Sequence, residues 1–233
     1  MRKYELTEET KTLAYGTVHR IRALMDISRY GVKAGDLGGW IEKYDNLSQD
    51  GDAWVFGNAE VYANAEVCGN AEVRGNAKVR GNAWVCDTAK VFVNAFVCDD
   101  AVVYDNAEVR GNAKVYGNAW VYDDAEVGGN AEVCGNALVC DTADYITFKN
   151  SWSSGRWFTY TRSNKMWKVG CFYGTGEELI KKAYADSVVS GKCYEAIVRA
   201  VETIELTKAD ALGPVSPPSL AGQIDLSTKG EHK

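Results

Sequence analysis

A six-residue phrase repeats without a break from Trp54 to Ala143, and no other feature constrains the fold of this chain as strongly. Its first and third positions are variable, and its second is Val. The fourth is usually Gly or Asp, the fifth is Asn, Asp or Thr, and the sixth is Ala, as in EVRGNA and WVCDTA. Fifteen copies occupy these 90 residues. Self-similarity at a fixed period indicates a solenoid. In a coil this uniform, catalytic residues are expected only where the pattern is broken.

The phrase also predicts the shape of each coil. Alternation along a short strand places the Val and Ala side chains on one side, where they would fill the interior. Gly or Asp followed by Asn suits a sharp corner, because these residues tolerate left-handed backbone angles. Three strands and three corners would close a triangular coil of 18 residues. The repeat therefore predicts about five stacked coils with parallel strands.

This pattern resembles the hexapeptide repeat of the single-stranded left-handed β-helix, which is known from bacterial acyltransferases. The resemblance implies a mainly β fold built on a left-handed parallel β-helix. The segments KYELTEETKTL and AGDLGGWIEKYDNLSQDGDAWV, together with the repeat, are also similar to bacterial and prophage-encoded hexapeptide-repeat proteins labelled putative transferases. That second likeness brings no catalytic residues with it.

The segments on either side of the repeat have a different character. Residues 1–53 are expected to form a β cap that covers the open edge of the first coil, with strands over Lys3–Leu6 and Val18–Asp26. Residues 144–207 are expected to form a small α+β domain, and residues 208–233, which hold all three prolines, a flexible tail. The domain's expected elements are strands over Tyr145–Lys149, Arg156–Arg162 and Met166–Tyr173, a helix from a Thr175–Glu178 capping box to Asp186, and a helix over 191–206.

Reading the outward residues at a stride of 18 sorts them onto three faces. Two of these faces are mostly charged or polar, as expected of surfaces in water. The third is almost entirely apolar, and a strip of this size should be covered. Either a second subunit covers it, as in the trimers common among proteins that resemble this one, or the chain's own C-terminal segment does. As an oligomer interface the strip would use Trp84, Val102, Tyr104, Trp120, Tyr122 and Leu138.

Catalysis by the coil itself is not expected. Hexapeptide-repeat acyltransferases typically use a histidine as general base, and this chain has only His19 in the cap and His232 in the tail. No inserted loop interrupts the fifteen phrases. The sequence therefore predicts no enzymatic activity, no cofactor and no metal site, with an unorthodox acyltransferase as the alternative.

The cysteines and the charges point to the compartment and the partners. Five of the seven cysteines share one slot of the repeat, which is typical of small apolar residues in a reducing environment rather than of a disulfide framework. Cys68 and Cys86 lie one rung apart, so this pair alone could oxidise or share a metal ion.

The chain has no apolar leader or membrane-length segment, and we expect a cytoplasmic protein of a bacterial host cell. Thirteen acidic and six basic residues in the repeat argue against nonspecific nucleic-acid binding by the coil.

The segment SWSSGRWFTYTRSNKMWK is the strongest candidate for a binding site. It interleaves cations with aromatic rings, and no acidic residue occurs from Lys149 to Gly176. Such a pattern can stack a base and neutralise phosphates. The alternative is that the rings pack the small domain while the cations offset the acidic coil. The candidate ligand-binding residues are Trp152, Arg156, Trp157, Tyr160, Arg162, Lys165, Trp167 and Lys168.

Together these features predict a non-catalytic, oligomeric β-helix scaffold, homotrimeric by resemblance and of phage or prophage origin. Its expected partner is a host protein or a nucleotide-like anionic ligand, and nucleic acid stays open. Sequestration of a nucleotide signal during anti-phage defence is one specific version. The alternatives are an acyltransferase and a structural component of a phage particle.

Overall fold

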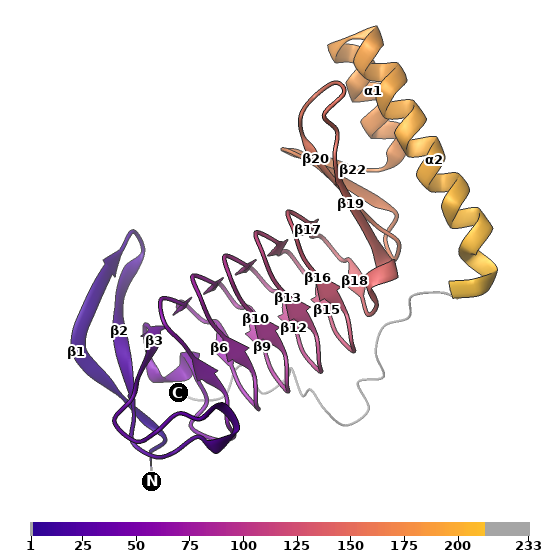
Figure 1. Cartoon of the computed structure of the whole chain (residues 1–233). Helices are drawn as coiled ribbons and strands as arrows, with labels where there is room; N and C mark the ends of the chain where they lie inside the picture. Colours follow the sequence, from indigo (N-terminus) through magenta and orange to yellow (C-terminus); the bar gives the residue numbers. More distant parts are fainter. Residues whose placement is uncertain (1, 213–233) are drawn as a thin grey trace.

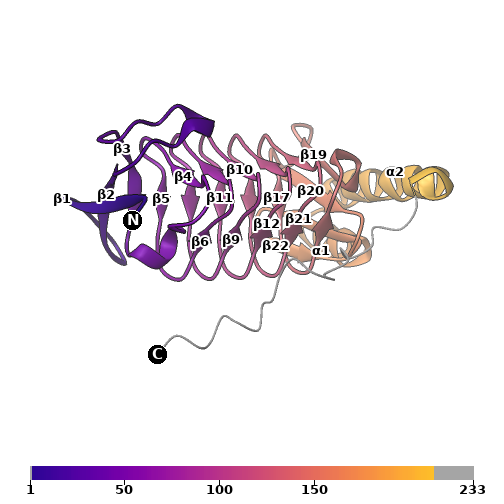
Figure 2. The same ribbon diagram turned by 90° about the horizontal axis from the view of Figure 1, so that it is seen from below.

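The computed structural model describes residues 2–212 and shows a β-helical rod with a β-hairpin at one end and an α+β module at the other (Figure 1). Turning the molecule shows the coils stacked along one axis between the hairpin and the helices (Figure 2). No helix among the described residues is long and apolar enough to span a membrane.

Each hexapeptide phrase contributes one two-residue strand, and the strands of successive coils pair in parallel. The Val at the second position and the Ala at the sixth position of every phrase are buried in one continuous interior, except Ala143 at the end of the last phrase, as the alternation predicts. The strands form three ladders. The first contains β4 (Trp54–Val55), β7 (Glu72–Val73), β10 (Lys90–Val91), β13 (Glu108–Val109) and β16 (Glu126–Val127). The second contains β5 (Glu60–Val61), β8 (Lys78–Val79), β11 (Phe96–Val97), β14 (Lys114–Val115) and β17 (Glu132–Val133), and the third contains β6 (Glu66–Val67), β9 (Trp84–Val85), β12 (Val102–Val103), β15 (Trp120–Val121) and β18 (Leu138–Val139).

The corners between strands have the backbone angles that the sequence predicts. Gly75 has a φ of 72°, and a Cβ atom there would lie 2.9 Å from the carbonyl oxygen of Val93 in the next coil. Asparagine side chains stack along one corner and hydrogen-bond from coil to coil, with Asn76 Nδ2 donating to Asn94 Oδ1 at 3.2 Å. The corners therefore contribute hydrogen bonds along the axis in addition to the strand ladders.

The solenoid starts earlier than the hexapeptide pattern does. Strand β3 (Leu37–Ile41) pairs in parallel with β5, and Leu47 forms a bridge with Val67. These contacts add a coil before the first phrase, so the rod has about six coils where the repeat count gave five. The Gly-rich segment before Trp40 permits this packing, because a Cβ on Gly39 would meet a Val55 methyl at 2.6 Å.

The rest of the N-terminal segment is an antiparallel hairpin that extends one ladder of the rod. Strand β1 (Tyr4–Leu13) pairs with β2 (Gly16–Ala23), and β2 pairs with β3. The first strand is longer than the predicted Lys3–Leu6, and the second begins and ends earlier than the predicted Val18–Asp26. Short 3-10 helices cover Ser28–Tyr30 (η1), Tyr44–Asn46 (η2) and, after the last coil, Thr142–Asp144 (η3).

The C-terminal module has four strands and two helices. One expected strand over 166–173 is divided at Gly170, where φ is 58°, so the sheet gains a fourth strand. The second helix is longer than expected and runs into the predicted tail; residues 213–233, with the rest of that tail and His232, lie outside the described residues. The elements are β19 (Tyr145–Lys149), β20 (Trp157–Thr161), β21 (Met166–Val169), β22 (Phe172–Gly174), α1 (Gly176–Asp186) and α2 (Val188–Leu212). The predicted Thr175–Glu178 capping box opens α1.

Candidate functional site

The last coil of the rod leaves backbone N–H groups without a following coil, and side chains beyond it accept their hydrogen bonds. Thr159 Oγ1 accepts from the Glu132 amide at 3.0 Å. Ser163 Oγ accepts from the Leu138 amide at 2.7 Å. The buried Asp144 carboxylate accepts from the Cys140 amide at 2.9 Å. These contacts fix the C-terminal module on the end of the rod.

Four of the eight predicted ligand-binding residues belong to this attachment or to the module's core. Arg162 pairs with Asp144 and Glu205, and Lys168 lies 3.7 Å from Glu132. The aromatic rings of Tyr160 and Trp167 are buried in the module core. Arg162 and Lys168 thus already neutralise carboxylates of the chain itself.

The other four predicted residues are exposed but lie in two places. Trp152 is 86% exposed in the turn before β20, and Trp157 is 39% exposed at the start of that strand. Arg156 stands between them. Lys165 lies in the turn after β20, on the side where Arg162 reaches the rod. Trp152, Arg156 and Trp157 are therefore neighbours in the sequence, before and at the start of β20, and Lys165 lies beyond the other end of that strand.

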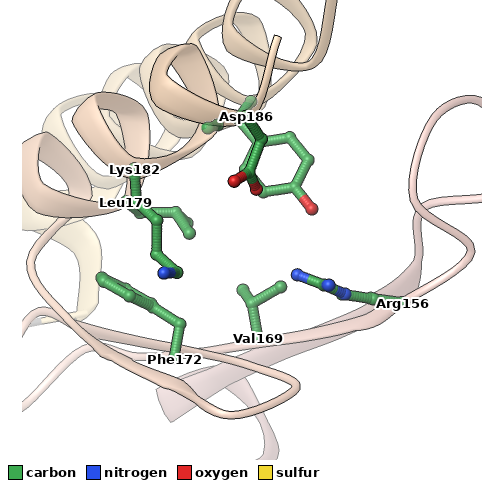
Figure 3. Close-up of a pocket in the computed structure, with 8 residues that line it drawn as sticks. Arg156, Val169, Phe172, Leu179, Lys182 and Asp186 are labelled. Carbon is green, nitrogen blue, oxygen red and sulfur yellow. The ribbon is translucent and has the colours of Figure 1, made fainter.

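Arg156 reaches into a small open pocket between the sheet and α1 (Figure 3). Val169, Phe172, Leu179 and Ala183 form an apolar lining. Figure 3 shows Arg156 and Lys182 entering this space from opposite sides, with Asp186 on the helix above. The lining residues are Arg156, Val169, Phe172, Leu179, Lys182, Ala183, Asp186 and Tyr194.

Three charged side chains at this pocket are exposed and not engaged elsewhere. Within the described residues, the side chains of Arg156, Lys182 and Asp186 form no hydrogen bond or ion pair of 4.0 Å or less. Sequence reasoning found Arg156 but missed Lys182 and Asp186. The signal was present: Lys182 and Asp186 lie three and seven residues after buried Leu179, which places all three on one helix face.

The predicted apolar strip is a continuous cluster on the third face of the rod. Val102, Tyr104 and Tyr122 are buried, and Trp84, Trp120 and Leu138 pack against them while staying partly accessible. The rings of Tyr104 and Tyr122 stack with centroids 5.5 Å apart, and Trp120 meets Tyr104 edge-on at 6.1 Å. The Tyr104 hydroxyl is buried without a hydrogen-bond partner, and burial raises the pKa of this phenol.

One pair of cysteines departs from the prediction that the repeat cysteines form no disulfide. Cys68 and Cys86 are bonded, with Cα atoms 4.6 Å apart. Stacking in one slot of adjacent coils brings the two Cα atoms within the range that a disulfide requires. Cys98, Cys134 and Cys140 remain free thiols in the same slot, and burial raises the pKa of each.

The one histidine among the described residues is His19, in the N-terminal hairpin. His19 lies on β2, where its Nδ1 atom is 3.2 Å from the carbonyl oxygen of Thr7. It is therefore held in the N-terminal hairpin, away from the pocket and the strip. No group of three or more His, Cys, Asp or Glu residues in the described part of the chain is arranged to hold a metal ion.

Comparison with known proteins gives one partial similarity. The chain is 39% identical over 62 residues to an uncharacterized acetyltransferase, YdcK, of Escherichia coli strain K12. The match covers 24% of this chain and 19% of that protein, so it spans about a fifth of the relative's length. No protein-family model matches the chain. The unbroken hexapeptide repeat, the parallel six-coil solenoid and this partial similarity are consistent with the hexapeptide-repeat β-helix superfamily.

Proposed function

We propose that this protein is a rigid β-helix scaffold that binds an anionic group, a phosphate or a carboxylate, in the pocket of its C-terminal module. One observation carries the proposal: Arg156 and Lys182 enter an apolar pocket from opposite sides, and neither cation has a partner in the described structure. Unpaired cations that converge on an apolar floor are typical of small-ligand sites.

The surroundings indicate what else such a ligand would carry. Asp186 accepts hydrogen bonds only, so it favours a donor group on the ligand beside the anion. Trp152 and Trp157 are exposed and flank Arg156 in the sequence, outside the pocket lining, so a ligand that extends beyond the pocket would find flat surfaces there for stacking a ring. A nucleotide-like ligand combines these features, and sequestering such a signal in anti-phage defence would be one use of the scaffold. An acidic segment of a host protein would satisfy the cations but not the stacking surfaces.

Calorimetric titration of the full chain with inorganic phosphate, adenosine monophosphate and acetate tests this proposal. We expect adenosine monophosphate to bind and the Arg156→Ala, Lys182→Ala double variant to weaken it by at least about tenfold, because two charge-assisted hydrogen bonds are lost. Lys181→Ala is the matched control, since Lys181 is an exposed neighbour on the same helix outside the pocket lining.

A second double variant removes one cation and one stacking surface together. Arg156→Ala with Trp157→Ala should lose adenosine monophosphate but keep the melting temperature of the parent, because both side chains are exposed. Binding that is equal in the parent and in both double variants contradicts the proposal. If phosphate and acetate bind and adenosine monophosphate binds no more tightly than phosphate, the ligand would be a simple anion.

Acyl transfer is the second candidate function, and the partial identity to YdcK favours it. The coil itself offers no histidine as a base, so an acyl acceptor would have to be activated in another way. Incubation with acetyl coenzyme A and detection of free thiol measures this activity directly. Turnover by the pure protein that the Lys182→Ala variant retains would favour the enzyme over the scaffold.

A further inference from the structure

Acidic side chains border the aromatic strip on both sides, along the two corners of the coil that flank it. Four aspartates stack along one corner at intervals of one coil, and a fifth follows one of them; two more lie on the opposite corner. These residues are Asp87, Asp105, Asp123, Asp141 and Asp124 on the first corner, and Asp99 and Asp100 on the second. The strip is thus an apolar band with a negative edge along one corner and a single pair of aspartates, in one coil, on the other.

The cations of the repeat lie on the other two faces, where carboxylates or rings hold them. Lys90 pairs with Glu108 at 2.7 Å, and Lys114 pairs with Glu132 at 2.9 Å. Arg80 lies over the ring of Phe96. Within residues 2–212, none of the seven bordering aspartates forms an ion pair of 4.0 Å or less. Their charge is therefore uncompensated by the rod that carries them.

The geometry of the solenoid concentrates this charge. Parallel strands of successive coils lie about 4.8 Å apart, so corner aspartates one coil apart are close like charges. Burial raises the pKa of Asp105, and the neighbouring carboxylates of Asp87 and Asp123 raise it further. A structural role accounts for part of the pattern, since Asp105 Oδ2 accepts from the Asp123 amide at 3.4 Å. An asparagine would accept that bond equally well, so the bond does not require the negative charge.

We propose that the strip docks a protein segment in which apolar side chains alternate with Lys or Arg. Apolar groups would pack on the accessible edges of Trp84, Trp120 and Leu138. The cations would reach the carboxylates on either side, where complementary charge guides association and fixes orientation. Packing of one strip on the strip of a second copy would instead bring the two acidic borders together. Nucleic acid and anionic lipid surfaces would be repelled.

Fluorescence anisotropy of the full chain with labelled synthetic peptides tests the assignment. The probe is a short peptide of alternating leucine and lysine, and the control peptide replaces lysine with glutamate. The Asp105→Asn, Asp123→Asn variant should weaken binding of the lysine peptide by about tenfold and reduce its dependence on salt. Glu108→Gln with Glu126→Gln removes two charges from another face and should leave binding unchanged.

A further variant addresses the apolar half of the surface. Trp84→Ser with Trp120→Ser should abolish binding of the lysine peptide while far-ultraviolet circular dichroism stays unchanged, because both rings lie outside the Val and Ala interior. Equal binding of the two peptides, or full binding by the asparagine variant, overturns the proposal. Self-association of the parent chain that the serine variant loses would assign the strip to a second copy and overturns it as well. The result is independent of ligand binding at Arg156 and Lys182, which the Lys182→Ala variant reports separately.

Discussion

The two ends of the rod need opposite chemistry, because a parallel solenoid has a direction. At the N-terminal end the first coil presents carbonyl oxygens, and donors cover them: the Lys3 ammonium donates to the carbonyls of Gly51 at 3.1 Å and Ala53 at 3.0 Å. At the C-terminal end the last coil presents N–H groups, and acceptors such as Asp144 and Thr159 cover them.

This difference explains why the two flanking segments are not interchangeable. Buried backbone groups without partners are costly, so each end of the solenoid selects the residue types that can satisfy it. The N-terminal segment supplies an ammonium, the Tyr4 hydroxyl on the Leu47 carbonyl at 2.7 Å, and the Asn46 amide. The C-terminal module supplies a carboxylate and hydroxyls. Opposite donors and acceptors thus close one continuous hydrogen-bond network.

The largest predicted effect concerns the C-terminal end. Asp144 is buried, accepts from two backbone amides and pairs with Arg162 at 2.9 Å. Asp144→Ala should lower the free energy of unfolding by about 3 to 5 kcal/mol, because it removes a buried carboxylate from the Asp144–Arg162–Glu205 network and leaves two backbone amides without their acceptor. Urea unfolding measures the change. Asp141 is an exposed neighbour at the end of the last coil, so Asp141→Ala should lower the free energy of unfolding far less. Equal losses of stability in the two variants would contradict the capping role of Asp144.

The N-terminal end gives the next effect, which depends on pH. Lys3 is 3% exposed, and burial lowers its pKa from 10.5 to about 8. Between these two values the unfolded chain binds more protons than the folded chain, so stability rises with pH across this window and falls as pH drops toward 8. The gain is at most about 1.4 kcal/mol per pH unit. Above pH 10 the buried tyrosines oppose it, since burial raises the pKa of Tyr4.

Chemical unfolding at several pH values from 7 to 10 checks this expectation. The Lys3→Met variant provides the control, because it keeps the buried aliphatic chain and removes the titrating group. Its stability should not rise across the window. If the stability of the variant rises as steeply with pH as that of the parent, another group is responsible. The pH dependence would then no longer distinguish the N-terminal end from the C-terminal end, where no lysine among the described residues is buried in this way.

Much of the rod could be predicted because the residues that build it are local to each phrase. The Val, Ala and corner residues determine the coil without reference to distant segments. The additional first coil was missed because its residues lack the phrase and pair at a different offset, Trp40 with Glu60. That coil is recognised only from its neighbours in space.

The site could be predicted only in part for a related reason. Arg162 and Lys168 resemble Arg156 in sequence context, yet their partners Asp144 and Glu132 come from the end of the rod. A local pattern of cations and rings cannot distinguish a cation that holds two domains together from one that is free to bind. Lys182 entered the site from the helix that packs beside the sheet, and no local pattern linked it to Arg156.

The smallest predicted effect concerns one hydrogen bond at the C-terminal end of the rod, between Thr159 and the Glu132 amide. Thr159→Val keeps the shape of a buried side chain and removes the hydroxyl that accepts from the Glu132 amide. We expect a loss of about 1 to 2 kcal/mol in urea unfolding, since one buried amide loses its acceptor. Thr161→Val provides a control on the same strand, because the buried Thr161 hydroxyl donates to Asn164 Oδ1 at 2.5 Å within the module. Hydrogen exchange should then quicken at the Glu132 amide in Thr159→Val alone. Unchanged protection of the Glu132 amide would show that the module does not cap the rod through this hydroxyl. Asp144 and Ser163 would then be the acceptors that distinguish the C-terminal end of the rod from the N-terminal end.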